Sequence, residues 1–548
     1  MVILCLLSAL NTAICQETLV YHFAVDMNQV ISCGLLSPVN GDLVIIRGSF
    51  SGWSGNDFML NDDDQDGIYR GTFNIRSDSG TLAEYKYLIL KPDGSSLWEK
   101  YPETGNEPHG NRYLIPSDTS LAEFNMDRYH LCLVGKEVFF TAEELKEDFT
   151  EFRNTLEKEH CCLYEYTTKN EFESLFDEQY HMVSKSMTPT EFFKILTPIT
   201  ARIGCGHTAL WMPDGFWSCG RNNLFPLQFR FLEDKTVVAG CYGDSTGIEK
   251  GSILLEINDV PISDLIYEIQ ANYSADAMNH HFIRKQIERR FSLIYARRFG
   301  FRGKFRVKYL SPGSEESEIA ELTPASLDAV RAVVFETFRH PPLTMEIIDT
   351  STALMKIPTF IYYDRVPWFT NFIDSCFALI HDKNIPNLIL DLRGNHGGDP
   401  FCAAPLLSYL LHEPQPYFSQ PNGKYAELAY PLPLPENHFT GNLFTLIDGH
   451  CFSTNGHFCS LLKYHQIGKL VGSPTGATYM CNAGKNRIKT LKNSEIMLYF
   501  GRSTYATAVK DMDKTQPIFP DYPVEQTLVD FLADRDTVLE YALNLIHQ

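Results

Sequence analysis

The chain has 548 residues, of which 44% are hydrophobic and 13% are aromatic, and its formal net charge at pH 7 is −21. This length is too great for one domain and predicts three or four, with enough apolar residues to bury real cores. The acidic balance argues against nucleic acid as a partner. Beyond the N-terminus, no run approaches the roughly 18 apolar residues that a membrane-spanning helix needs.

The N-terminal residues 2–15 (VILCLLSALNTAIC) form a short apolar run. The run is too short to span a bilayer, but it fits the apolar core of a secretory signal with a small-residue cleavage site. We therefore expect residues 1–16 to be a signal peptide and the protein to be secreted, periplasmic or at the cell surface. A lipid-anchored Cys15 and a buried N-terminal strand are the alternatives.

The 14 cysteines stand singly apart from Cys161-Cys162, and none forms a CxxC pair. Structural zinc sites use such closely spaced pairs, so no zinc site is expected. Several cysteines, such as Cys376, Cys402 and Cys459, lie in apolar helical patterns and are expected in the core. The sequence predicts no metal and no organic cofactor.

Residues 17–130 predict a β-sandwich. Short runs with strand character are separated by Gly- and Asp-rich turns, as at residues 44–50, 67–74 and 84–90. The turn from Asp62 to Gly67 superficially resembles a calcium loop through its alternating aspartates. Its twelfth position is a phenylalanine instead of the required glutamate, so a hairpin turn is expected there.

Helical patterns begin near residue 139. Thr141 and Glu144 form a capping-box signal for a helix that reaches about His160, and Thr188-Pro-Thr-Glu191 begins another that ends near Gly204. We assign residues 137–220 to a helical segment.

Residues 221–320 have a mixed pattern, with a strand–turn–strand at 251–262 and an arginine-rich helix at 277–298. A solvated face is the expected role of the arginines, and contact with a peptide carboxylate is the alternative. Strands and helices alternate through residues 340–548, which predicts an α/β core.

Two strand-to-turn-to-helix units in this core carry the chemistry. Residues 387–398 (NLILDLRGNHGG) run from an apolar strand into a glycine turn, and residues 446–458 (LIDGHCFSTNGHF) run from a strand through Ser453 into a helix. A serine needs a base to take its proton and donors to stabilise an oxyanion. Free N–H groups at the start of a helix, together with Gly397 and Gly398, can supply such donors.

A structural explanation exists for each of these residues: Ser453 can be a simple N-cap, and the glycines a tight turn. The sequence around Ser453 is not a GxSxG elbow, so an α/β-hydrolase is not indicated. His207, between glycine and threonine at the end of a predicted helix, is the best candidate for the base. His450 and His457, which flank the serine, are its rivals.

Together these motifs resemble the tail-specific (C-terminal processing) and tricorn-core serine peptidase family over roughly residues 139–548. The likeness rests on their order: GCGHT at 204–208, a PDZ-like segment from 225 to about 312, DLRGNHGG at 391–398, Ser453, and PDYPV at 520–524. The resemblance implies a C-terminal crotonase-like ββα core. It implies Ser453 as the nucleophile, with the Thr454 N–H and a glycine of the 397–398 pair as oxyanion donors.

The family has two catalytic arrangements. One uses a Ser/Lys dyad, but Thr478 stands at the lysine position and the nearest downstream lysine, Lys485, is seven residues too far on. The other uses a histidine from the GHT element, which is His207 here, and a carboxylate near the C-terminal PD element. Asp513 is the candidate carboxylate, with Asp511 beside it, although neither aligns cleanly with the glutamate of the family.

The resemblance also implies roles for two other regions. The PDZ-like segment would bind an extended peptide, with a structural spacer as the alternative. The N-terminal sandwich resembles starch- and glycogen-binding modules, which makes Trp53, Lys86, Trp98 and Asn111 the candidate glycan site. In the alternative, this module is a spacer and its tryptophans are core residues.

The sequence therefore predicts an exported serine endopeptidase with peptide or protein substrates, in which Ser453 forms the acyl-enzyme and His207 is the general base. A glycan is a further predicted ligand. The alternative is a non-catalytic protein on a peptidase-like scaffold that binds a peptide, a small apolar ligand or a glycan.

Overall fold

The computed structural model describes residues 17–32, 36–77, 84–99, 112–113, 126–128, 139–219, 222–243, 246–335, 342–479 and 483–548. The predicted signal peptide and Asn111 lie outside the described residues. The chain divides into an N-terminal unit, Met1–Glu137 with Pro213–Cys219, and a main unit, Val138–Met212 with Gly220–Gln548. None of the helices in the described ranges is long and apolar enough to cross a membrane.

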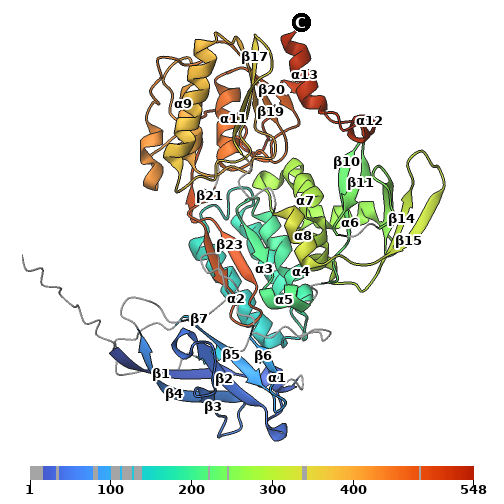
Figure 1. Cartoon of the computed structure of the whole chain (residues 1–548), viewed down its shortest axis with the longest axis vertical. Coiled ribbons are helices and arrows are strands. Elements are labelled where there is room, and N and C mark those ends of the chain that lie inside the picture. Colours follow the sequence, from blue (N-terminus) through green and yellow to red (C-terminus); the bar gives the residue numbers. More distant parts are fainter. Residues whose placement is uncertain are drawn as a thin grey trace, which may run out of the picture. The chain divides into compact units, whose positions relative to one another are not determined.

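The N-terminal unit contains two β-sheets, in the orders β4–β1–β8 and β3–β2–β5–β6, with β7 also paired to β5 (Figure 1). Buried residues from both sheets, among them Phe23, Val44 and Tyr87, share one core. The strands expected at 44–50, 67–74 and 84–90 are β2, β4 and β5. The elements are β1 (Glu17–Asp26), α1 (Asn28–Ser32), β2 (Leu43–Gly48), β3 (Met59–Leu60), β4 (Ile68–Ser77), β5 (Glu84–Leu90), β6 (Ser96–Trp98), β7 (Arg112–Tyr113), β8 (Met126–Arg128) and α5 (Asp214–Cys219).

The acidic turn between β3 and β4 is a hydrogen-bonded turn, as the sequence predicts. Asp62 accepts hydrogen bonds from the backbone N–H groups of Asp66 and Gly67 at 3.1 and 3.0 Å. Arg70 forms ion pairs with Asp64 and Asp66 at 3.2 and 2.7 Å. A protein cation thus already lies against two of the three carboxylates.

The main unit begins with three helices, α2 (Ala142–Glu159), α3 (Lys169–Met182) and α4 (Pro189–Arg202). Each starts at a threonine that shares a reciprocal capping box with the glutamate three residues later. The capping boxes expected at Thr141 and Thr188 are confirmed, and Thr168 begins a third.

Strand pairing connects the helical segment to residues near the C-terminal end of the chain. β9 (Ala209–Trp211) pairs with β23 (Met497–Phe500), and β22 (Arg487–Thr490) completes a three-stranded sheet. The buried carboxylate of Asp148 on α2 accepts backbone hydrogen bonds from Asn493 and Ser494 at 2.8 and 2.7 Å. Residues far along the chain are therefore part of the support of this segment.

A six-stranded antiparallel sheet, mainly in the order β10–β11–β12–β14–β15, follows with helices α6, α7 and α8. The predicted strand–turn–strand at 251–262 is present, with Asn258 and Asp259 at positive φ in the turn. The predicted helix at 277–298 begins later because residues 276–278 form a short 3₁₀ turn. The bounds are β10 (Leu227–Leu232), β11 (Lys235–Cys241), β12 (Ile253–Ile257), β13 (Val260–Pro261), α6 (Ile262–Ala271), α7 (His280–Phe299), β14 (Phe305–Leu310), β15 (Ser317–Leu322) and α8 (Leu327–Val334).

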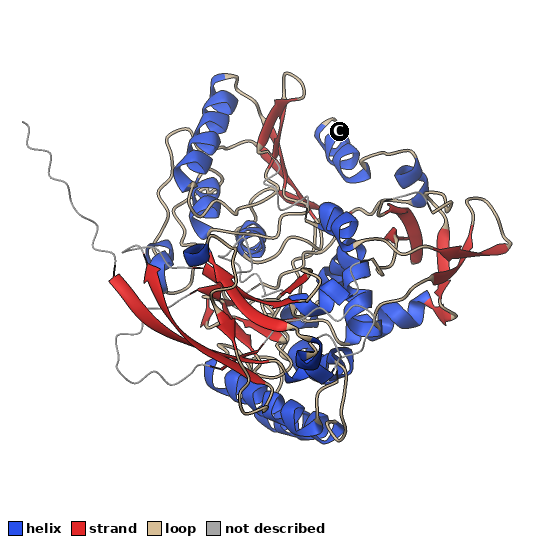
Figure 2. Ribbon diagram, turned by 60° about the horizontal axis from the view of Figure 1, so that its bottom comes forward, coloured by secondary structure: helices blue, strands red, loops and turns tan. Residues whose placement is uncertain are grey.

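The predicted α/β core is a sheet in the order β16–β17–β18–β19–β20–β25, parallel except for its edge strand β16. α9, α10 and α11 pack on one face and α13 on the other. Figure 1 labels α9, α11 and α13 beside the strands of this sheet, and Figure 2 distinguishes helices from strands by colour. The bounds are β16 (Thr344–Ile347), β17 (Thr352–Lys356), α9 (Val366–Asp382), β18 (Asn387–Asp391), α10 (Pro400–Ser408), β19 (Asn442–Ile447), α11 (Thr454–Tyr464), β20 (Lys469–Gly472), β21 (Ala483–Gly484), β24 (Ser503–Thr504), β25 (Tyr522–Pro523), α12 (Leu528–Leu532) and α13 (Thr537–Ile546).

The sheet order brings the two sequence motifs together. β18 and β19 are parallel neighbours, with Asp391 opposite Leu446. The glycine turn after β18 and the serine turn after β19 therefore leave the same edge of the sheet. The carboxyl edge of a parallel sheet is where such folds usually place their ligand and reaction sites.

Candidate active site

Ser453 lies at the N-cap position of α11, but its side chain makes no capping hydrogen bond. Its φ and ψ are 55° and −129°, a backbone conformation that is rare for residues other than glycine and costs about 1–3 kcal/mol. The Ser453 Oγ is instead 3.1 Å from Nε2 of His207. The simple N-cap explanation therefore does not describe this serine.

His207 lies in the loop between α4 and β9, 246 residues from Ser453 in sequence. Its ring stacks on that of Phe452, with centroids 4.7 Å apart. Any side chain at Gly206 would meet the same Phe452 ring at 2.7 Å, so glycine allows the loop to approach the serine turn. Burial lowers the pKa of His207, which favours the neutral ring that a general base requires.

The glycine turn presents one of the two predicted backbone donors. The Gly397 N–H is occupied, because it donates to Asn395 Oδ1 at 2.7 Å. The Gly398 and Thr454 N–H groups have no hydrogen-bond acceptor within the part of the chain that the structure describes. The Thr454 hydroxyl donates to the Gly398 carbonyl at 2.6 Å and holds the two turns together.

Both glycines are required by close packing. A Cβ at Gly397 would lie 2.7 Å from the Phe452 carbonyl oxygen and the Thr454 nitrogen, and one at Gly398 would lie 2.1 Å from the Phe360 backbone. Both residues also have positive φ, 93° and 144°. This part of the sequence is constrained by geometry that only glycine satisfies.

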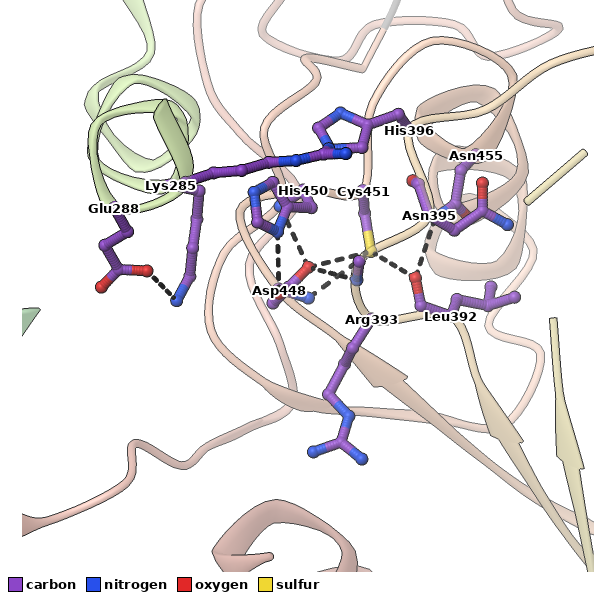
Figure 3. Close-up of polar contacts among 12 residues, drawn as sticks. Lys285, Glu288, Leu392, Arg393, Asn395, His396, Asp448, His450, Cys451 and Asn455 are labelled. Atoms are coloured by element: carbon purple, nitrogen blue, oxygen red, sulfur yellow. Dashed lines mark hydrogen bonds and ion pairs between the residues drawn. The ribbon is translucent and has the colours of Figure 1, made fainter. Parts of the chain in front are cut away.

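A buried polar network holds the glycine turn in place (Figure 3). Asn455 donates to the carbonyl groups of Leu392 and Asn395 at 3.2 and 2.9 Å. Asp448 accepts from the Gly394 N–H at 3.1 Å. Burial alone would raise the pKa of Asp448, but the hydrogen bond and charge of His450 lower it well below its usual value, so an ionised carboxylate is maintained there.

The predicted carboxylate, Asp513, does not reach His207. It is exposed, and it accepts hydrogen bonds from the Thr515 N–H and hydroxyl at 2.9 and 2.7 Å. Local turn chemistry therefore accounts for this aspartate. Asp511 is exposed as well.

Asp276, in the short turn before α7, is the carboxylate that lies near the histidine. One of its oxygens, a ring nitrogen of His207 and the Cys205 sulfur lie within 4.8 Å of one another. Asp276 Oδ1 accepts from the Gly206 N–H at 2.8 Å, whereas Asp276 Oδ2 and His207 Nδ1 are buried without a partner among the described residues. Sequence reasoning missed Asp276, which no motif marks.

None of the rival bases, all of them described residues, is hydrogen-bonded to the Ser453 hydroxyl, which lies against His207. His450 pairs with Asp448 at 3.5 Å. His457 is buried among aromatic rings, and burial lowers its pKa to about 3. Lys485 is exposed, with its side chain against Gly423.

The candidate glycan site is only partly described. Trp53 and Trp98 are half-buried neighbours, with ring centroids 6.4 Å apart, and the Arg47 guanidinium lies over the Trp98 ring at 5.6 Å. Lys86 is half-buried on β5, opposite Arg47. Glycan binding stays a prediction.

The fold and the Ser453–His207 pair define an α/β protein with a candidate hydrolytic site at the carboxyl edge of its sheet. Residues 351–524 match Peptidase family S41, and the chain thus contains a domain of this family. This agrees with the family resemblance noted in the sequence and supports a serine peptidase function.

One relative and two solved structures of another protein accompany this match. The nisin-resistance protein of Lactococcus lactis subsp. lactis is 26% identical over an alignment of 207 residues. The match covers 32% of this chain and 56% of that protein, so the chain spans only about half of this relative's length. The structure of mature CPAF complexed with lactacystin has a TM-score of 0.53 at 12% identity, covering 74% of this chain and 97% of CPAF. A second structure of mature CPAF gives 0.52 at 13% identity, covering 73% and 95%. At such identities the CPAF structures show a shared fold.

Proposed function

We propose that this protein is a serine endopeptidase in which Ser453 is the nucleophile and His207 the general base. The observation that carries the proposal is the 3.1 Å contact between Ser453 Oγ and His207 Nε2, made by a serine in a strained backbone conformation. The match to Peptidase family S41 supports the same chemistry.

The reaction follows from the geometry. As Ser453 Oγ attacks the peptide carbonyl carbon, its proton passes to His207 Nε2, and the carbonyl oxygen becomes negative. The N–H groups of Gly398 and Thr454 can stabilise that oxyanion, Thr454 also being at the N-terminus of α11. His207 then donates the proton to the leaving amine, and water hydrolyses the acyl-enzyme with His207 again acting as base.

Asp276 is the proposed partner of the other ring nitrogen of His207. Burial raises the pKa of Asp276 well above its usual value, so an isolated Asp276 favours its neutral form. The positive charge that develops on His207 when it accepts the serine proton would favour ionisation of Asp276. A carboxyl group at this distance can therefore stabilise the imidazolium and hold the ring orientation.

A serine-directed phosphonate probe tests the proposal on the full chain, on Ser453→Ala and on His207→Ala. We expect wild type to be labelled and both variants to lose labelling, while His381→Ala, an exposed histidine near the end of α9, retains it. Cleavage of unfolded casein should follow the same order. Labelling that persists in His207→Ala would contradict the role of His207 as the base. A folded wild type that is not labelled by the probe and does not cleave casein would contradict the proposed peptidase activity.

A further inference from the structure

A cavity of about 330 Å³ lies beside His207, and one face of helix α7 forms much of its wall. We call it the His207 cavity. Gln286, Arg290, Ile294 and Arg297 of α7 all line it, and the helix is kinked at Arg290, where φ is −128° and ψ is 17°. Phe282 and Arg298 of α7 also line this cavity.

The charge of the His207 cavity is one-sided. Three arginines line it, and no aspartate or glutamate is among its lining residues. Arg298 already has an acidic partner outside the cavity, Glu268, at 3.0 Å. The cationic character that remains belongs to Arg290 and Arg297.

Arg297 is the cation that lacks a counter-charge. It forms no ion pair within the described ranges, its Nε has no hydrogen-bond partner there, and its Nη1 makes only a long 3.4 Å contact with the Leu210 carbonyl. Desolvation lowers the pKa of Arg297, Tyr273 acts in the opposite direction, and the charge of Arg290 adds to the lowering. A bound anion would relieve the desolvation and the repulsion from Arg290.

Gln286 supplies an independent indication of a ligand. Its side chain is 2% exposed, and its amide nitrogen has no partner among the described residues. Buried polar groups without partners are rare in folded proteins and call for an explanation. This amide lies on the same cavity wall as Arg297 but about three helical turns from it, so it would contact a different acceptor of a bound peptide, such as a backbone carbonyl.

We infer that the His207 cavity binds the carboxylate of an acidic side chain in the peptide substrate, with Arg297 as its donor and Gln286 as a donor to a backbone carbonyl of the same peptide. A guanidinium suits a planar carboxylate, and an amide N–H suits a carbonyl oxygen. The apolar wall, which includes Phe193, Ile269 and Ile294, suits the methylene groups of such a side chain. This inference rests on the proposed function and specifies its substrate class: peptides with Glu or Asp close to the cleaved bond.

Binding to the uncleaving Ser453→Ala protein tests the inference separately from catalysis. The probe is a random decapeptide pool, acetylated and amidated so that side chains are the only carboxylates. We expect bound peptides to be enriched in Glu or Asp over Gln or Asn, and a Glu→Gln change in a selected peptide to weaken its Kd about tenfold or more.

Two substitutions, each added to Ser453→Ala, identify the donors. Arg297→Met keeps an unbranched apolar side chain and should abolish the acidic preference. Gln286→Glu is nearly isosteric and should turn the preference against acidic peptides, which keeps the test valid if the first variant folds poorly. The control is Arg302→Met, an exposed arginine just beyond α7 that does not line the cavity.

The outcomes are distinct. No acidic enrichment, or enrichment unchanged in both cavity variants, would overturn the inference. Selectivity that appears only with a pool bearing free C-terminal carboxylates would also overturn it, because the carboxylate would then come from the chain end. If Ser453→Ala prefers acidic peptides but the wild type is not labelled by a serine-directed phosphonate, carboxylate binding in the His207 cavity is supported and the proposed peptidase activity is rejected.

Discussion

Helix α7 separates two cavities of different electrostatic character. The His207 cavity has arginines and no acids on its wall, whereas a larger cavity of about 490 Å³ on another face of α7 is balanced. We call this one the balanced cavity. Its acidic lining residues are Glu288, Asp448, Glu525, Asp534 and Asp536, and its lysines and arginines are Arg230, Arg284, Lys285, Arg393 and Arg535.

The difference teaches that size alone does not identify a functional cavity. Charges in the balanced cavity satisfy each other: Glu288 pairs with Lys285 at 2.9 Å, and Arg393 pairs with Asp536 at 2.7 Å. The smaller cavity contains His207 and Arg297, a cation with no ion pair among the described residues. A ligand gains most where the protein has left polar groups unsatisfied.

Among the variants that test this comparison, Asp276→Asn, beside His207, should have the largest effect on activity. The change removes the group that can stabilise the His207 imidazolium, so kcat should fall about a hundredfold, with little change in KM. The pH profile should also move, because loss of a neighbouring acid lowers the apparent pKa of His207. A fall in kcat with an unmoved pH profile would assign Asp276 a purely structural role.

In the balanced cavity, Glu288→Gln should destabilise the protein by about 2 kcal/mol, because Lys285 and Arg230 lose their shared buried partner. Urea unfolding measures the change. Burial favours neutral Glu288, but these two cations lower its pKa overall. Its stabilisation should therefore be complete above the unfolded pKa of about 4.3 and disappear as pH falls through the lower folded value.

The matched control for that measurement is the more exposed pair of Glu256 with Lys308 at 2.8 Å. Glu256→Gln should cost less than about 1 kcal/mol, since surface pairs contribute little. Equal losses in the free energy of unfolding for the two variants would show that the ion pairs of Glu288 in the balanced cavity contribute no more than a surface pair.

The pH dependence of kcat/KM sharpens the description of the His207 cavity. Burial lowers the pKa of His207 below 6.5, and the neutral ring is the base in the proposed mechanism. Activity should therefore be flat from about pH 6.5 into the neutral range and fall tenfold per pH unit only below the lowered pKa. An acid limb centred above pH 6.5 would contradict this environment.

The smallest effect is expected from Arg297→Met, measured by urea unfolding without peptide. Because Arg297 has no ion pair within the described residues, its charge contributes little, and stability should stay within about 0.5 kcal/mol of wild type. A loss as large as that of Glu288→Gln would show that Arg297 is a structural cation, and the contrast between the cavities would fail.

Local sequence signals were sufficient for much of the fold. Thr141 and Thr188 mark helix starts because a capping box needs only four consecutive residues. Ser453, Gly398 and Thr454 could be found because a strand, a turn and a helix start are local features, and the parallel pairing of β18 with β19 then joins them.

The carboxylate that lies near His207 could not be predicted from local sequence signals. The C-terminal PD element indicates Asp513 only by its nearness in sequence. In the structure the Asp513 carboxylate accepts a hydrogen bond from the Thr515 N–H within its own turn. Asp276 lies 70 residues from Gly206, to which it is hydrogen-bonded, and only the tertiary fold brings the two together. The sequence predicts a solvated face for the arginines of α7, but none of them is fully exposed. The sequence does not show which face of a helix another segment will cover, so this prediction is wrong.

The pairing of β9 with β23 has a consequence for protein synthesis. The loop that carries His207 leads into β9, and β9 reaches its partner only when residues 497–500 are present. A nascent chain that has not yet exposed this late strand lacks one support of His207, the proposed base, even though Ser453 has already been synthesised. The peptidase activity proposed above would therefore arise late in synthesis, which limits cleavage of neighbouring chains by unfinished copies.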